Sequence, residues 1–166
     1  MDINILKVDS ELQIKNTAQL AHLIWNQHFT PIIGASQVEY MLKEFQSCDA
    51  ISCQINDGVN YYIAALNGKN LGYLALIRDQ ENKKMMISKI YIKQDARNLG
   101  IGSAFLNFTI EQCKLSNLNT IWLTVNRFNQ NSIDWYTKNG FTIIDEVKKD
   151  IGNGFFMDDF IMEKIL

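Results

Sequence analysis

The sequence has few of the features that mark an extracellular, fibrous or disordered protein. It contains only three cysteines, Cys48, Cys53 and Cys113, and none belongs to a Cys-x-x-Cys pair. An odd number without such pairs argues against a disulfide scaffold and against a structural zinc site. The single proline and the lack of a polar low-complexity run argue against disordered tails. We therefore expect a soluble globule in a reducing compartment, the cytoplasm.

No charge sign dominates, and no apolar run is long enough to span a membrane. The 16 basic and 18 acidic residues leave a formal net charge of -2, which offers no field to attract nucleic acid or an anionic membrane surface. The first residues lack a cationic segment followed by a long apolar stretch, so we expect no signal peptide. With 166 residues, 47% of them hydrophobic, the chain fits one domain over 1–166.

Hydrophobic periodicity and turn residues predict alternating helices and strands. Ser10 with Gln13, and Ser36 with Glu39, form two capping-box patterns that predict helix starts. The first helix is expected to run to about His28, and a linker at 30–34 should separate it from the second. Strands are predicted at residues 3–8, 59–66, 71–77, 85–92, 120–125, 141–147 and 155–165, and further helices at 50–55, 101–115 and 132–138.

Two hairpins complete this pattern. Asn67-Gly68 is a strong two-residue turn signal, and a second hairpin crosses residues 151–154. The principal elements follow the order β-α-α-β-β-β-α-β-α-β-β. This order predicts an α/β (α+β) fold in one domain, with a mixed, mostly antiparallel sheet and helices on both faces.

The most informative stretch is the strand, turn and helix start over residues 89–103. Gly100 and Gly102 let the backbone approach a ligand, and free N–H groups of the helix's first turn attract anions. Arg97 adds a permanent cation that can pair with phosphate. A Walker loop is excluded because no Gly-Lys-Ser/Thr occurs here, and a dinucleotide fingerprint is excluded because Phe105 replaces its third glycine. A tight turn without a ligand is the alternative.

The segment Arg97-Asn98-Leu99-Gly100-Ile101-Gly102 resembles the pyrophosphate signature of Gcn5-related N-acetyltransferases (GNAT), which reads Gln/Arg-x-x-Gly-x-Gly/Ala. A second block, residues 129–136 followed by Gly140-Phe141, is similar to that family's Asn-x-x-Ala-x-x-x-Tyr and Gly-Phe pattern. The resemblance implies an acetyl-CoA-dependent N-acetyltransferase that transfers its acetyl group directly to a primary amine, through a tetrahedral intermediate.

The resemblance also implies roles for individual residues. Tyr136 would protonate the departing thiolate, and the alternative is that it is a core aromatic. Asn129 would contact the CoA arm, and the alternative is that it is a loop residue ahead of a short helix. The backbone of the preceding strand would hold the pantetheine arm, and the turn would hold the pyrophosphate. The cofactor-binding residues implied are Ile90, Tyr91, Ile92, Arg97, Asn98, Leu99, Gly100, Ile101, Gly102, Ser103 and Asn129.

The general base is left open by the sequence. Some relatives in the family carry a glutamate on the strand occupied here by Thr124, and threonine cannot act as that base. A water chain ending on another acidic group or on His28 is an alternative. With His22 and His28 the only histidines, and neither beside a cysteine or carboxylate cluster, we expect no metal site.

The acceptor is also open. The tail at 150–159 resembles bacterial acetyltransferases similar to polyamine acetylases, which makes a polyamine or another small amine the leading acceptor. Asp158 and Asp159 are alternative amine-binding residues. Because strand neighbours face opposite sides, at most one of them can point into a given pocket. We expect both to be solvated or paired with Lys148 or Lys149. Acetylation of protein N-termini or lysines, and a non-catalytic acyl-CoA sensor, are the other readings. Edge strands of the closing hairpin allow a homodimer.

Overall fold

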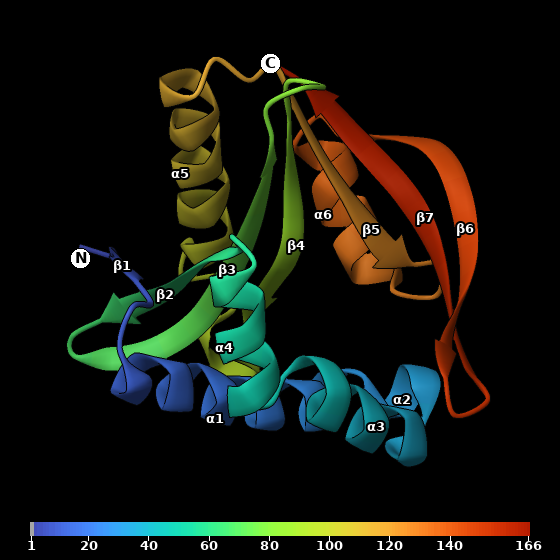
Figure 1. The fold of residues 1–166 in the computed structure, drawn as a ribbon. Coiled ribbons are helices and arrows are strands. Elements are labelled where there is room, and N and C mark those ends of the chain that lie inside the picture. Colours follow the sequence, from blue (N-terminus) through green and yellow to red (C-terminus); the bar gives the residue numbers. More distant parts are fainter. Residues whose placement is uncertain (1) are drawn as a thin grey trace. The chain divides into compact units, whose positions relative to one another are not determined.

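The computed structural model describes residues 2–166, and the chain forms one seven-stranded sheet with six α-helices (Figure 1). Its elements are β1 (Asn4–Lys7), α1 (Glu11–His28), α2 (Thr30–Ile33), α3 (Ala35–Phe45), α4 (Cys48–Asn56), β2 (Asn60–Leu66), β3 (Lys69–Asp79), β4 (Lys84–Ile92), a 3-10 turn η1 (Gln94–Ala96), α5 (Ile101–Leu115), β5 (Thr120–Asn126), α6 (Gln130–Lys138), β6 (Thr142–Gly152) and β7 (Phe155–Ile165).

The strand order in the sheet is β1-β2-β3-β4-β5-β7-β6. The pairs β1/β2, β2/β3, β5/β7 and β6/β7 are antiparallel, whereas β4/β5 is parallel. The parallel register joins Lys84–Met86 to Thr120–Trp122. The mixed, mostly antiparallel sheet predicted from the sequence is therefore confirmed.

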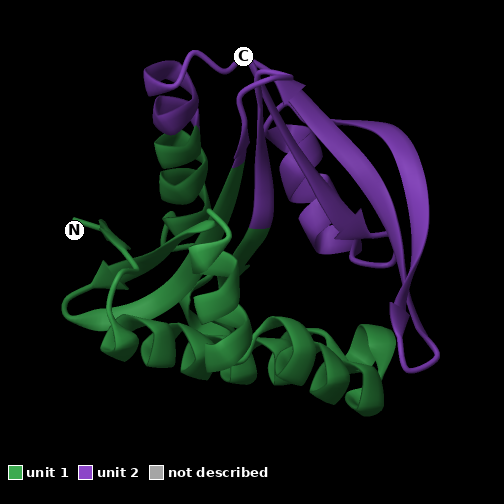
Figure 2. Ribbon diagram, viewed as in Figure 1, with its two compact units in different colours: residues 1–77, 89–109 green, residues 78–88, 110–166 purple. Residues whose placement is uncertain are grey.

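The chain divides into two compact units (Figure 2). Unit 1 comprises residues up to 77 together with 89–109. In it, helices lie on both faces of the β2–β3 pair. Trp25 of α1 donates to the Tyr73 hydroxyl at 3.1 Å on one face. On the other face, the Tyr62 ring contacts Phe108 of α5, with centroids 4.7 Å apart, because adjacent strand residues point to opposite sides.

A buried lysine ties β4 to the helices of unit 1. Lys89 Nζ donates to the carbonyl oxygen of Phe45 at 2.7 Å, to Gln54 Oε1 at 2.8 Å and to the Tyr61 hydroxyl. Burial lowers the pKa of Lys89 to about 7, whereas the three acceptors favour its charged form. These bonds join the end of α3, the middle of α4 and strand β2 to the strand that precedes the glycine turn.

Unit 2 comprises residues 78–88 and 110–166 and contains the β5–β7–β6 part of the sheet with α6. Its core is built from Ile121, Leu123, Phe141 and Met162, all at most 1% exposed. Lys164 of β7 donates to the carbonyl oxygen of Asn139 at 2.9 Å, at the end of α6. The helix therefore lies on the Lys164 face of β7, and the residues that alternate with Lys164 point to the opposite face.

The sequence located most elements correctly. The Ser10–Gln13 capping box is present at the start of α1. Asn67 and Gly68 turn the first hairpin with φ of 51° and 74°, and Asn153 and Gly154 turn the closing one with φ of 53° and 77°. These left-handed pairs fit a type I′ turn.

The region between β1 and β2 differs from the prediction. The expected linker at 30–34 contains the single-turn helix α2, and the short helix expected at 50–55 is longer, as α4, so four helices occupy this region. The capping box predicted at Ser36 is wrong: α3 begins after Gly34, with no side-chain cap, and Ser36 lies inside the helix. Gly34 ends α2 with φ of 85°, so it sets both boundaries.

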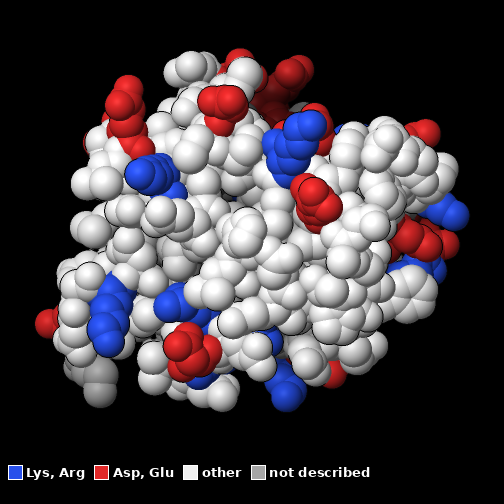
Figure 3. Space-filling view, turned by 90° about the horizontal axis from the view of Figure 1, so that it is seen from below, with Lys and Arg blue, Asp and Glu red and all other residues white. Residues whose placement is uncertain are grey.

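Charged side chains of both signs are scattered over the face shown in Figure 3, without a block of one sign. This agrees with the balanced composition of 16 basic and 18 acidic residues. No helix within residues 2–166 is long and apolar enough to cross a membrane.

Candidate active site

The strand before the glycine turn is packed closely against its neighbour. A Cβ added at Gly72 of β3 would lie 2.7 Å from the Tyr91 carbonyl oxygen, so only glycine fits beside β4 here. Lys93 N–H donates to the Leu71 carbonyl oxygen at 2.9 Å. The Tyr91 ring lies in an aromatic cluster with Trp25, Phe29 and Tyr73. These contacts fix the backbone of Ile90–Ile92.

The turn leads directly into the first turn of α5. Asn98 and Gly100 both have left-handed backbones, with φ of 70° and 81°. The Ala104 N–H donates to the Gly100 carbonyl oxygen at 2.9 Å, which starts the helix. A Cβ at Gly100 would meet no atom within 4 Å, so the glycine faces open space. The 15-residue helix α5 supplies unpaired N–H groups and the positive end of its dipole at this point.

Arg97 is held by a residue far away in the sequence. Its Nη2 lies 3.1 Å from Nδ1 of His28, at the end of α1. Because the guanidinium can only donate, His28 Nδ1 is the acceptor, and the imidazole is neutral in this contact. His28 also contacts the Phe29 ring edge-on, with centroids 4.7 Å apart. The histidine suggested by the sequence as an alternative base thus contacts the arginine of the turn.

Asn129 and Tyr136 lie in unit 2, at the start and in the body of α6. Asn129 is 6% exposed; its N–H donates to the Asn126 carbonyl oxygen at 2.9 Å and its carbonyl accepts from Ile133 at 3.1 Å. Tyr136 is 7% exposed and contacts Phe141 edge-on, with centroids 5.5 Å apart. Burial raises the pKa of Tyr136 well above its ordinary value, so the phenol stays protonated at neutral pH.

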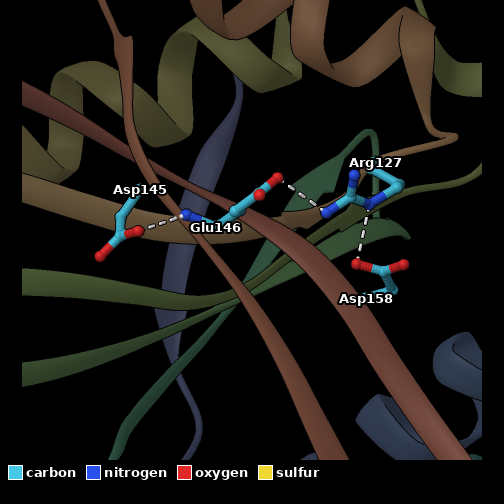
Figure 4. A network of polar contacts seen from close by, with 4 residues as sticks. All are labelled: Arg127, Asp145, Glu146 and Asp158. Carbon is cyan, nitrogen blue, oxygen red and sulfur yellow. Dashed lines mark hydrogen bonds and ion pairs between the residues drawn. The ribbon is translucent and has the colours of Figure 1, made fainter.

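The two aspartates of β7 behave differently from the prediction. Asp158 pairs with Arg127, whose Nε donates to Asp158 Oδ1 at 2.7 Å and whose Nη2 donates to Glu146 Oε2 at 2.9 Å (Figure 4). Figure 4 also shows Asp145 accepting the Glu146 N–H, at 2.8 Å. The expected partners Lys148 and Lys149 are not used, because Arg127 follows β5 and reaches Asp158 across the strand pair.

Asp159 is neither solvated nor paired with a lysine, which corrects the sequence expectation. It is 4% exposed, and its Oδ1 has no hydrogen-bond partner among residues 2–166. Burial raises the pKa of Asp159 to about 6, and the Thr124 hydroxyl partly offsets this rise by hydrogen bonding. A buried carboxyl oxygen without a hydrogen-bond partner is unusual in a folded protein.

Comparison with known proteins identifies the family. The model of the acetyltransferase (GNAT) family matches residues 18–141, which include the glycine turn, Asn129 and Tyr136. The chain belongs to the GNAT family. Two relatives are uncharacterised N-acetyltransferases: one from Lactobacillus delbrueckii subsp. lactis is 26% identical over 66% of this chain, and one from Methanocaldococcus jannaschii is 30% identical over 55% of it. The chain spans only 66% and 43% of their respective lengths.

A solved structure extends the likeness to the whole chain. The PaiA N-acetyltransferase from Thermoplasma acidophilum, in complex with coenzyme A, superposes with a TM-score of 0.81 at 24% identity and covers 100% of both chains. At this identity the likeness shows the fold, and the GNAT fold expected from the sequence is confirmed.

Within this GNAT chain, all the predicted site residues except two form one segment of unit 1, and Asn129 and Tyr136 belong to α6 in unit 2. Sequence reasoning missed the roles of Lys89, Arg127 and His28 as binding partners inside the fold. His28 was expected only as an alternative base, and Asp158 and Asp159 as alternative amine-binding residues. The burial of Asp159 could not be read from a pattern in which two aspartates are adjacent. No group of three or more metal-binding side chains occurs within residues 2–166.

Proposed function

We propose that this chain transfers the acetyl group of acetyl-CoA to a primary amine, and that the acceptor is a small amine such as a polyamine. The observation that carries the proposal is the turn at Arg97–Ser103, an open glycine turn at the start of a long helix, in a chain matched by the GNAT family over that turn. The proposal includes no metal.

The residues of the turn fit a pyrophosphate. Gly100 leaves open space beside the backbone, and the N–H groups at the start of α5, in Ile101, Gly102 and Ser103, favour anions. Arg97 adds a cation whose position is set by His28. Asn98 and Leu99 supply the backbone between them. An anion with several oxygens can therefore be bound here by backbone donors and one guanidinium.

Acetyl-CoA supplies an activated thioester, and the chain's own residues supply orientation and a proton. We assign the backbone of Ile90, Tyr91 and Ile92 to the pantetheine arm and to polarising the thioester carbonyl, and Asn129 to the CoA arm. Tyr136 gives its hydroxyl proton to the thiolate as the carbon–sulfur bond breaks and the carbon–nitrogen bond forms. The attacking nitrogen then loses its excess proton to give the amide, and this proton restores the phenol of Tyr136.

The first test is release of the CoA thiol from acetyl-CoA by the purified protein, with polyamines, amino acids, aminoglycosides and short peptides as acceptors. Release with small amines supports the proposal, and release only with peptides supports acetylation of protein N-termini or lysines instead. Tight acetyl-CoA binding without release across the panel contradicts the transferase and supports an acyl-CoA sensor.

Tyr136→Phe tests the general acid. We expect turnover to fall about 100-fold or more, the range for loss of a positioned proton donor, while acetyl-CoA affinity in calorimetry changes less than about twofold because the ring is kept. Trp135→Phe is the matched control, since it alters the neighbouring ring without removing a phenol. Wild-type turnover in the Tyr136 variant would remove the assigned role.

We also propose a cytoplasmic location and a homodimer. The dimer is supported by β6, which lies at the edge of the sheet and exposes Ile143, Ile144 and Val147; exposed apolar edge strands favour association. Sedimentation of the wild type and of Ile144→Lys tests this, and a monomeric wild type would contradict it.

A further inference from the structure

Asp159 forms no ion pair with any side chain of residues 2–166. The ion pairs formed within residues 2–166 join Lys84 to Glu163 and Arg127 to Glu146 and Asp158, and none includes Asp159. Asp159 is nevertheless 4% exposed, with Oδ1 unpartnered. A buried carboxylate without an ion-pair partner is unfavourable, so a cationic ligand would supply the missing positive charge.

The register places Asp159 beside Thr124. Asp159 pairs with Asn126 across the β5/β7 ladder, and Thr124 pairs with Ile161, two residues further along β7. Asp159 and Thr124 are therefore diagonal neighbours on one face of the sheet, within reach of each other. The Thr124 hydroxyl is close enough to act on the Asp159 carboxyl by hydrogen bonding.

This face is opposite to the one covered by α6. Lys164, which contacts the end of α6, is an odd number of residues from Asp159 along β7, so their side chains point to opposite sides. Tyr136 on α6 and Asp159 on β7 therefore belong to opposite sides of the β5/β7 pair.

The charged groups around Asp159 do not neutralise it. Arg127 and Asp158 influence its titration with opposite signs, and Arg127 already binds Asp158 and Glu146. On β6, the residue opposite Asp159 is Val147, and the charged residues that share its face, Asp145 and Lys149, are exposed. On β7, Glu163 shares the face and pairs with Lys84.

We propose that Asp159 is the residue that binds the protonated amine of the acceptor and accepts its proton. The ammonium pairs with the Asp159 carboxylate, one N–H bond breaks, the proton passes to Oδ1, and the neutral amine keeps the electron pair that attacks the thioester carbon. The Thr124 hydroxyl positions the carboxylate. This inference rests on the proposed function and defines the acceptor as an amine that is cationic in solution.

Asp159→Asn tests the inference, with Asp158→Asn as a matched control that removes the same charge from the adjacent residue on the other face. Using the amine that gives wild-type CoA release, we expect kcat/KM of Asp159→Asn to fall about 100-fold or more, with acetyl-CoA affinity changed less than about twofold. The acidic limb of the wild-type pH profile should be absent from what activity remains. Asp158→Asn should stay within a few-fold of wild type.

A second measurement needs neither acetyl-CoA nor turnover. The carboxyl carbon of Asp159 is titrated by ¹³C NMR in the free protein, with and without spermidine, and a seated ammonium should lower its midpoint by roughly one pH unit or more. An unchanged midpoint together with wild-type kinetics in Asp159→Asn would overturn the inference and leave the transferase intact. A wild type that releases no CoA thiol with any amine refutes the proposed function, whereas a spermidine-dependent midpoint would still support amine binding at Asp159.

Discussion

Replacing Asp159 by asparagine should change how the stability of the protein depends on pH. The pKa of this carboxyl rises from an ordinary 3.8 to about 6 because the group is buried. One pKa unit corresponds to 1.36 kcal/mol, so ionisation of Asp159 costs the folded state about 3 kcal/mol relative to the unfolded chain. Because Asp159 is only 4% exposed, solvent screening reduces this value little.

The sign follows from which state binds the proton. Between pH 4 and pH 6 the folded protein keeps the proton while the unfolded chain has lost it, so the contribution of Asp159 to stability is full below about pH 4 and is lost as the pH rises through 6. An asparagine has no charge to bury. The difference in unfolding free energy, variant minus wild type, should therefore rise by about 3 kcal/mol between pH 4 and pH 7.5.

Urea unfolding of both proteins at half-unit steps of pH measures this difference. A fixed penalty for burying the asparagine amide shifts the whole curve and leaves its slope unchanged. Asp158→Asn provides the contrast, since it removes an ion pair whose partners are 29% and 33% exposed and should lower stability at neutral pH by about 1 kcal/mol or less. A difference curve for Asp159→Asn that is flat to within about 0.5 kcal/mol would refute the reasoning.

Three further substitutions test the unit 1 part of the candidate site. Gly100→Val should abolish acetyl-CoA binding in calorimetry by filling the open space at the turn; Gly58→Val, which imposes a similar left-handed strain at φ of 98° after α4, should keep it, and equal affinity in the two variants would contradict the phosphate role. Gly72→Ala should destabilise the fold in urea by about 1–3 kcal/mol, because its Cβ meets the Tyr91 carbonyl at 2.7 Å; a loss below 0.5 kcal/mol would mean that β3 and β4 separate easily. Trp25→Phe should lower stability by about 1–2 kcal/mol, because the Tyr73 hydroxyl loses its buried donor; unchanged stability would show that this bond contributes nothing.

Local signals predicted the parts of the fold that local physics decides. The Ser10 capping box and the Asn67-Gly68 turn were predicted correctly because side chain and backbone make these structures within a few residues. The same rule failed at Ser36, where Gly34 starts the helix and the serine has no cap to make. A pattern with a chemically reasonable spacing does not show which of two nearby boundaries the chain uses.

The candidate site was predicted where it is continuous in sequence and missed where it is assembled by folding. The turn at Arg97–Ser103 is one segment, so its motif could be read directly. The contact between Arg97 and His28 joins residues from two distant elements, and neither carries a signal of the other. The three acceptors around Lys89 also come from three elements, and a lysine within a strand of mostly apolar residues gives no indication that it is buried.

Asp159 illustrates why a motif search at fixed positions can miss a carboxylate that the neighbouring strand of the sheet supplies. Some members of the family carry a carboxylate on the strand of Thr124, and its absence here left the general base unassigned. In the antiparallel ladder, however, Asp159 is the diagonal neighbour of Thr124 on the same face. The Asp159 side chain on β7 can therefore lie where a glutamate at position 124 of β5 would place its carboxylate. Alternation along β7 correctly separated Asp158 from Asp159, but only the register with β5 shows that Asp159, rather than Asp158, shares the face of Thr124.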